Sequence, residues 1–122
     1  MAFIKANTND FNFHGRWEET AHGFIGNWCR PYVEFIFKGS EFTVVTKGPN
    51  AEYIITVDGE KYVSTEGKSH KLTVLISDSD SHLIRIAKTT TRYFLEFVGI
   101  ETEGEIEKAN ADAIEDLLKA VL

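Results

Sequence analysis

The residues able to carry out chemistry are few and lie far apart in this sequence. Four histidines occur, at His14, His22, His70 and His82. None has a partner at a close metal-binding spacing such as His-x-x-x-His. The run Asp-Ser-Asp-Ser-His over residues 78–82 lacks the third acid, the glycine and the distal glutamate of a calcium loop. Neighbours in one tight turn cannot converge as a catalytic triad either. We therefore predict a solvated turn there, with no catalytic residue and no metal site.

Cys29 is the only cysteine, so no disulfide can form within the chain. A cationic neighbour such as Arg30 favours a reactive thiolate. However, a lone cysteine beside a tryptophan, here Trp28, is more often a small packed hydrophobe. We interpret Cys29 as a packing residue, compatible with a reducing compartment. Because no phosphate-binding glycine loop, Gly-x-Ser-x-Gly or His-Glu-x-x-His motif occurs, no cofactor is expected.

Two aromatic residues, Trp28 and Tyr32, lie at the C-terminal end of an irregular segment, residues 18–30, that contains Gly23 and Gly26. Loops of this kind often hold binding residues, and sugars stack on exposed aromatic rings. Trp28, Tyr32 and the intervening Arg30 are therefore the candidate glycan-binding residues. The alternative is that both rings pack in the core, which is the commoner place for a tryptophan.

The elements that must position these residues are short strands with period-two alternation, bounded by turn residues. About eight are expected, over residues 11–17, 32–37, 41–46, 51–57, 61–64, 71–76, 82–87 and 92–100. In one of them Val33, Phe35 and Phe37 share a face, opposite Tyr32 and Glu34. Asp58-Gly59 is the strongest hairpin signal, because a type I′ turn needs two residues that tolerate positive φ. The pattern predicts an all-β, antiparallel, jelly-roll-like β-sandwich.

The tail differs from this body, because its apolar residues recur at three- and four-residue spacing. They are Ile106, Ala109, Ala113, Ile114, Leu117, Leu118 and Val121. This spacing predicts an acidic amphipathic C-terminal α-helix within residues 102–122. Its apolar stripe packs either on its own sandwich or on a partner. In the second case the interface residues are Ile106, Ala113, Ile114, Leu117, Leu118 and Val121.

The 122-residue chain has a net charge of −6, of which −5 belongs to residues 101–122 and −1 to the first hundred residues. Its few bases are scattered, which argues against nucleic acid and against anionic membranes as partners. No apolar run approaches the ~20 residues of a membrane span. The first residues also lack the apolar stretch of a signal peptide.

The body resembles the N-terminal jelly-roll domain of the family 2 carbohydrate acetyl esterases. The matching stretches are Gly-Arg-Trp at 15–17, Trp28, Val-Glu-Phe-Ile-Phe-Lys-Gly-Ser at 33–40, Val-Asp-Gly at 57–59, His-Lys-Leu-Thr-Val at 70–74, Ile-Arg-Ile-Ala-Lys-Thr at 84–89 and Phe-Val-Gly-Ile at 97–100. The resemblance covers about residues 14–101 and implies a β-sandwich, which we place over residues 1–101. The helix predicted from the apolar spacing follows it over 102–122. In that family a separate serine hydrolase domain with a Gly-Asp-Ser motif supplies the nucleophile. This sequence contains no such motif, so the resemblance implies the fold and argues against esterase activity.

Two functions remain open. The first is a non-catalytic assembly role, as a phage virion accessory protein that decorates a capsid or tail. It would be made in the host cytoplasm and form a homo-oligomer, with a trimer favoured. The second is a glycan-binding module that acts beside a separate carbohydrate-active enzyme. The apolar stripe of the tail favours the first, and the region around Trp28 and Tyr32 favours the second.

Overall fold

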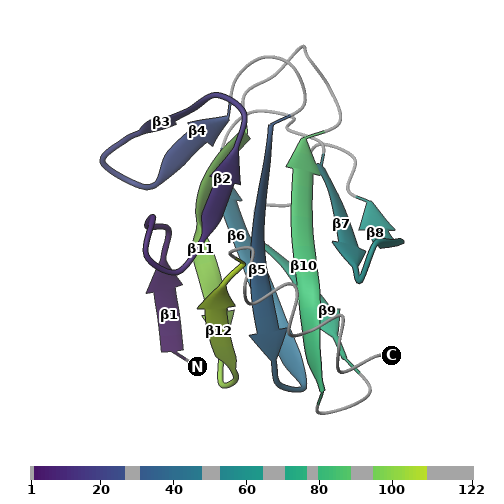
Figure 1. Cartoon of the computed structure of the whole chain (residues 1–122). Helices are drawn as coiled ribbons and strands as arrows, with labels where there is room; N and C mark the ends of the chain where they lie inside the picture. The colour runs from purple at the N-terminus through teal and green to yellow at the C-terminus, as the bar shows by residue number, and fades with distance from the viewer. Residues whose placement is uncertain are drawn as a thin grey trace.

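A computed structural model describes residues 2–26, 31–47, 53–64, 71–76, 80–88 and 95–109. Every regular element in these ranges is a β-strand, and the strands form two antiparallel sheets that pack face to face (Figure 1). The predicted all-β antiparallel sandwich is therefore confirmed. The same ranges contain no helix long and apolar enough to cross a membrane.

The first sheet has the strand order β3-β4-β11-β6-β9, and β1 also pairs with β11. Its strands are β1 (Ala2–Lys5), β3 (Trp17–Glu19), β4 (Phe24–Gly26), β6 (Glu41–Lys47), β9 (Lys71–Leu75) and β11 (Leu95–Thr102). The pairing of β1 with β11 places the first strand beside a strand from near the other end of the described chain.

The second sheet has the order β12-β5-β10-β7-β8, and β2 also pairs with β5. Its strands are β2 (Asn12–His14), β5 (Tyr32–Lys38), β7 (Tyr53–Val57), β8 (Glu60–Ser64), β10 (Ser81–Lys88) and β12 (Glu105–Lys108). β5 is bordered by β10 along one edge, and β2 and β12 pair with different halves of its length. This sheet is the nearer layer in Figure 1.

The core lies between the sheets and is built from the alternate residues that the sequence predicts. Val33, Phe35 and Phe37 of β5 are buried, as are Phe42 and Val44 of β6. Rings from opposite sheets meet directly: the centroids of Phe35 and Phe42 are 5.8 Å apart, and those of Phe37 and Phe42 are 4.9 Å apart. Aromatic pairs at such distances add to the free energy gained by burying their area.

The predicted hairpin turn at Asp58-Gly59 is confirmed and joins β7 to β8. Asp58 has a φ of 53° and Gly59 one of 87°, which are the two positive values that a type I′ turn requires. The turn is also fixed to β10. The amide of Asp58 donates to the carbonyl oxygen of Leu83 at 2.8 Å, and Oδ1 of Asp58 accepts from the amide of Leu83 at 2.9 Å.

The predicted helix over 102–122 is wrong wherever the structure describes it. β11 continues to Thr102, and residues 105–108 form β12, which pairs with β5. The sequence Glu-Ile-Glu-Lys also alternates with a period of two, and an open edge of β5 provides the strand partner. Gly104 permits the tight turn between the strands, because a Cβ there would lie 2.5 Å from the carbonyl oxygen of Lys38. Residues 110–122, which contain Ala113, Ile114, Leu117, Leu118 and Val121, lie outside the described residues.

Several short strands are not predicted by the alternation of apolar and polar residues. The described ranges therefore contain more strands than the eight expected. β1 and β4 fall in segments that showed no clear alternation, and the run over 11–17 divides into β2 and β3. The division occurs at Gly15, whose φ of 93° strains any residue with a Cβ. A Cβ there would also lie 3.0 Å from Cα of Pro31.

Candidate binding face of the second sheet

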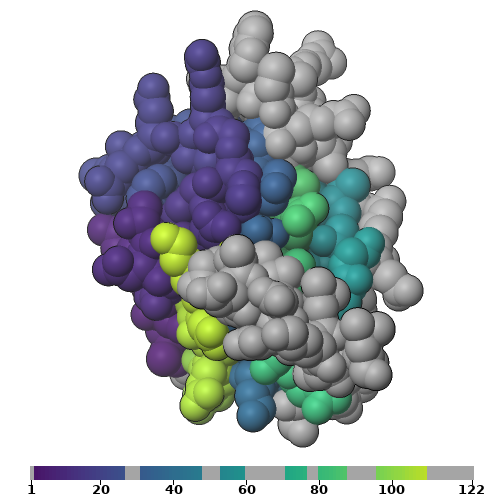
Figure 2. All heavy atoms as spheres, viewed as in Figure 1, coloured from purple at the N-terminus to yellow at the C-terminus, as the bar shows by residue number. Residues whose placement is uncertain are grey.

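The side of β5 that faces away from the core contains Tyr32, Glu34, Ile36 and Lys38, as alternation requires. The neighbouring strands place further polar residues on this outer face. His14 of β2 is opposite Tyr32, and Arg85 of β10 is opposite Glu34. Figure 2 shows that atoms of β2, β5 and β10 reach the surface close together on this side of the molecule.

Glu34 is the centre of this group, and its side chain is only 4% exposed. Its Oε2 accepts hydrogen bonds from Nη2 of Arg85 at 3.1 Å and from Nε of Arg85 at 3.3 Å. Its Oε1 is 2.9 Å from Nε2 of His14, and because a carboxylate only accepts, this nitrogen bears the hydrogen. Each oxygen of the buried carboxylate thus has a partner, as burial of a charge demands.

The ring of Tyr32 is held between side chains from the two strands that border β5. The ring of His14 stacks on it, with centroids 4.4 Å apart and planes at 20°. The guanidinium carbon of Arg85 lies 4.4 Å from the centroid of the same ring. We call His14, Tyr32, Glu34 and Arg85 the Arg85 cluster. Since the Tyr32 ring already has stacking partners, a ligand at this cluster would contact mainly its polar edges.

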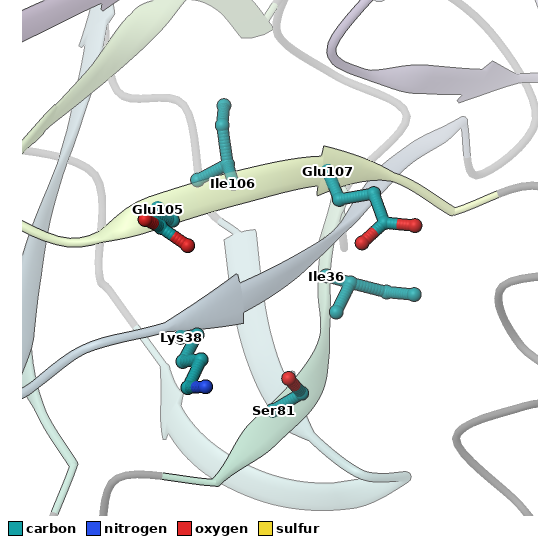
Figure 3. A pocket seen from close by; sticks show the side chains of 6 residues that line it. All are labelled: Ile36, Lys38, Ser81, Glu105, Ile106 and Glu107. Atoms are coloured by element: carbon teal, nitrogen blue, oxygen red, sulfur yellow. The ribbon is translucent and has the colours of Figure 1, made fainter.

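A small pocket lies at the other end of the same face (Figure 3). It is lined by Ile36, Lys38, Ser81, Glu105, Ile106 and Glu107. Glu105 is opposite Lys38 and Glu107 is opposite Ile36 in the pairing of β12 with β5. The two glutamates lie on one side of β12 and Ile106 on the other (Figure 3). The pocket therefore combines an apolar wall with charged groups of both signs.

The structure describes one of the three predicted glycan-binding residues. Tyr32 belongs to the Arg85 cluster, whereas Trp28 and Arg30 lie outside the described residues. Of the predicted interface residues, Ile106 lies in β12 and its partly buried side chain packs against the core of its own sandwich. The other five are in the range that the structure leaves undescribed.

Sequence reasoning missed His14, Glu34 and Arg85 as a group. A signal was present, because Glu34 and Arg85 each stand alone between apolar residues in the middle of a strand. A charged residue in such a place needs a partner when its neighbours are buried. The pairing of β5 with β10, which no local pattern reveals, makes these two residues partners.

A second pair of a histidine and a carboxylate lies at the hairpin between β7 and β8. Nδ1 of His82 is 2.6 Å from Oδ2 of Asp58, and the side chain of Asp58 is 47% exposed. His82 is thus bonded to a residue that is distant in sequence. Because Asp58 is also tied to the backbone of Leu83, this pair anchors the hairpin to β10.

No family model and no curated protein matches the chain. Several solved structures, however, match the chain. A family two carbohydrate esterase from Cellvibrio japonicus matches with a TM-score of 0.74 and 15% identity, over 87% of this chain and 34% of that one. A family two esterase from Clostridium thermocellum, solved with cellohexaose, matches with a TM-score of 0.69 and 21% identity, over 79% of this chain and 32% of that one. A CBM36 carbohydrate-binding module, solved with calcium and xylotriose, matches with a TM-score of 0.60 and 14% identity, over 83% of this chain and 98% of that one.

The CBM36 module was solved with calcium, so a metal site among the described residues is of interest. The described ranges contain no group of three or more His, Cys, Asp and Glu side chains that could hold a metal ion. The Arg85 cluster brings one carboxylate, and that carboxylate is already bonded to Arg85 and His14.

The similarities confirm the resemblance inferred from the sequence, at the level of the fold. This chain spans about a third of the length of the esterases, 34% in the first of them. It spans nearly the whole length of the carbohydrate-binding modules, 98% in two of them. The chain therefore has the jelly-roll β-sandwich fold that family two carbohydrate esterases and CBM36 modules share.

Proposed function

We propose that this chain is a non-catalytic glycan-binding module that acts beside a separate carbohydrate-active enzyme. One observation carries the proposal: carbohydrate-binding modules correspond to this chain over 98% of their own length. The esterases correspond to it over only about a third of theirs, 34% in the Cellvibrio japonicus enzyme. The chain also lacks the Gly-Asp-Ser motif expected of a hydrolase domain of that family.

The chemistry of the Arg85 cluster supports this proposal. Small-ligand sites combine apolar or aromatic surface with a few fixed polar groups. Here the aromatic surface is the edge of Tyr32, and the fixed polar groups are those of Arg85 and His14. Sugar hydroxyls both donate and accept hydrogen bonds, so they suit a guanidinium and an imidazole held in place by a buried carboxylate.

Replacement of Tyr32 by alanine tests the proposal. We expect the wild-type chain to be retarded in affinity electrophoresis through at least one gel of a broad polysaccharide panel. Tyr32→Ala should weaken this retention about tenfold or more, since Arg85 and His14 lose the ring on which they stack.

The matched control is Phe3→Ala. Phe3 is also an aromatic residue, is 49% exposed and lies in β1 of the other sheet. This variant should be retained like the wild type. Failure of the wild-type chain to bind any glycan of the panel would contradict the proposed function. Equal losses in both variants would contradict its assignment to this face.

The alternative, a virion accessory role with a trimeric assembly, stays a prediction from the sequence. It depends on the apolar residues of the tail, and all of those but Ile106 and Ala109 lie outside the described residues. Among the described residues, Ile106 packs against the core of its own sandwich.

A further inference from the structure

The buried carboxylate of Glu34 holds Arg85 in one orientation. Oε2 of Glu34 accepts from both Nε and Nη2 of Arg85, so the guanidinium plane cannot turn about its last bond without breaking a hydrogen bond. The opposite oxygen, Oε1, is held by His14. Tyr32 lies against the guanidinium, with its ring centroid 4.4 Å from Cζ. The guanidinium is therefore preorganised by contacts with its edge and its face.

This arrangement leaves one edge of Arg85 open. A guanidinium has five N–H donors, and Glu34 uses one on Nε and one on Nη2. The remaining donors include two parallel N–H groups along the edge formed by Nη1 and Nη2. In the part of the chain that the structure describes, Nη1 has no hydrogen-bond partner, and the side chain is 43% exposed.

The surroundings of this edge leave it available to an anion. The residues directly beside Arg85 on the outer face are Glu34 and Thr56 across the strands, and Leu83 and Ala87 along β10. Among these described neighbours, Glu34 provides the one carboxylate, and it already bonds to Arg85. The net charge of −6 acts at longer range, where salt screens it within about 8 Å.

Building on the proposed function, we infer that the Arg85 cluster recognises the carboxylate of a uronic-acid-containing glycan. Two parallel N–H groups at the open edge match the two oxygens of a carboxylate, which is the bidentate geometry that arginine favours. Arg85 is the residue that binds the carboxylate of the ligand. Toward this carboxylate, Glu34 and Tyr32 act as positioning residues, because they fix the guanidinium.

The probe is trigalacturonate, compared by calorimetry with its carboxyl-reduced form, which keeps the hydroxyls and loses the charges. We expect the acidic trisaccharide to bind at least about tenfold more tightly than the reduced one. Arg85→Gln should abolish this preference. Arg85→Lys keeps the charge but not the planar pair of donors, so it should lose most of the preference as well.

Lys71→Gln is the matched control. Lys71 is likewise bonded to a glutamate, Glu101, at 3.0 Å, but it lies on the outer face of the first sheet. Lys71→Gln changes the net charge by the same amount as Arg85→Gln. Because Lys71 lies away from the Arg85 cluster, binding should stay unchanged. Melting curves distinguish lost binding from lost folding in Arg85→Gln, and Arg85→Lys provides the same comparison with a cation still available to Glu34.

The outcomes separate the two proposals. If neutral and acidic trisaccharides bind equally and Arg85→Gln binds both like the wild type, the inference is overturned while the proposed function stands. If neither these probes nor any other glycan binds, both are overturned. If triglutamate displaces trigalacturonate at equal concentration, the carboxylate site stands but its assignment to a glycan is overturned.

Discussion

At the scale of single residues, two buried polar side chains show how the sandwich treats groups that need partners. Glu34 lies on the outer face, has its charge balanced by Arg85 and is hydrogen-bonded to His14. Tyr53 lies in the core with no exposed surface, and its hydroxyl lies beside Thr46, which is also buried. The first arrangement creates a polar surface that can bind a ligand. The second affects only stability, and it does so in a way that depends on pH.

Burial raises the pKa of Tyr53 above its usual value of 10.0, and the neighbouring Thr46 opposes this by a smaller amount. The folded state therefore holds the phenol proton more tightly than the unfolded state does. The stability from this difference is fully present below the unfolded pKa and is lost as pH rises from there through the folded pKa.

We expect Tyr53→Phe to change the free energy of unfolding by about 1 kcal/mol or less at neutral pH, where it removes only the buried hydroxyl. Above about pH 10 the variant should gain stability relative to the wild type, because phenylalanine has no proton to lose. Urea unfolding of both proteins at a series of pH values measures the difference, and lysine titration cancels in the comparison. Parallel stability curves up to pH 11 would contradict the raised pKa.

At the scale of elements, the sequence predicts the long strands well and the short ones poorly. In β5, β6 and β9 enough residues alternate for the core face to be assigned correctly, including Val74 of β9. Strands of three or four residues, such as β3, β4 and β12, show too few alternations to be recognised. Their existence depends on a partner strand that is distant in the sequence, as β12 depends on β5.

The candidate site follows the same rule. Tyr32 was predicted from its own surroundings in the sequence. Its partners come from β2 and β10, which lie on either side of β5 only because of the sheet order. Local alternation correctly places Glu34 on the outer face. It cannot show that Arg85, 51 residues later, supplies the opposite charge.

Ile106 tests the assignment of residues 105–108 to a strand. Its partly buried side chain packs against the core, whereas its neighbour Glu107 is exposed on the other side of β12. Ile106→Ala should lower the free energy of unfolding by about 1–2 kcal/mol, because the lost methyl groups leave a gap that the core cannot fully close.

Glu107→Ala is the matched control and should change the stability by less than about 0.5 kcal/mol. Denaturant unfolding measures both variants. A helix that uses Ile106 to contact a partner predicts a different result: unchanged stability of the isolated chain, with a change in its oligomeric mass. That result would contradict the position of Ile106 in β12.

At the scale of the whole molecule, the two sheets share one core. The ring of Phe11, next to β2 of the second sheet, packs against Phe97 of the first sheet, with centroids 5.0 Å apart. Phe35 of the second sheet likewise packs against Phe42 of the first. Neither sheet can expose its inner face without exposing that of the other. The candidate binding face on the outside of the second sheet therefore depends on residues of the first sheet that are far from it.

A matched pair of valines tests this dependence. Val33 belongs to the second sheet and Val74 to the first, and both are buried in the shared core. Replacing either by alanine should cost about 2 kcal/mol. Both variants should unfold in a single transition, with the same urea midpoint by tryptophan fluorescence and by far-ultraviolet circular dichroism. If Val74→Ala separated the midpoints of the two probes while Val33→Ala did not, the sheets would be independent units. The Arg85 cluster would then be supported by the second sheet alone.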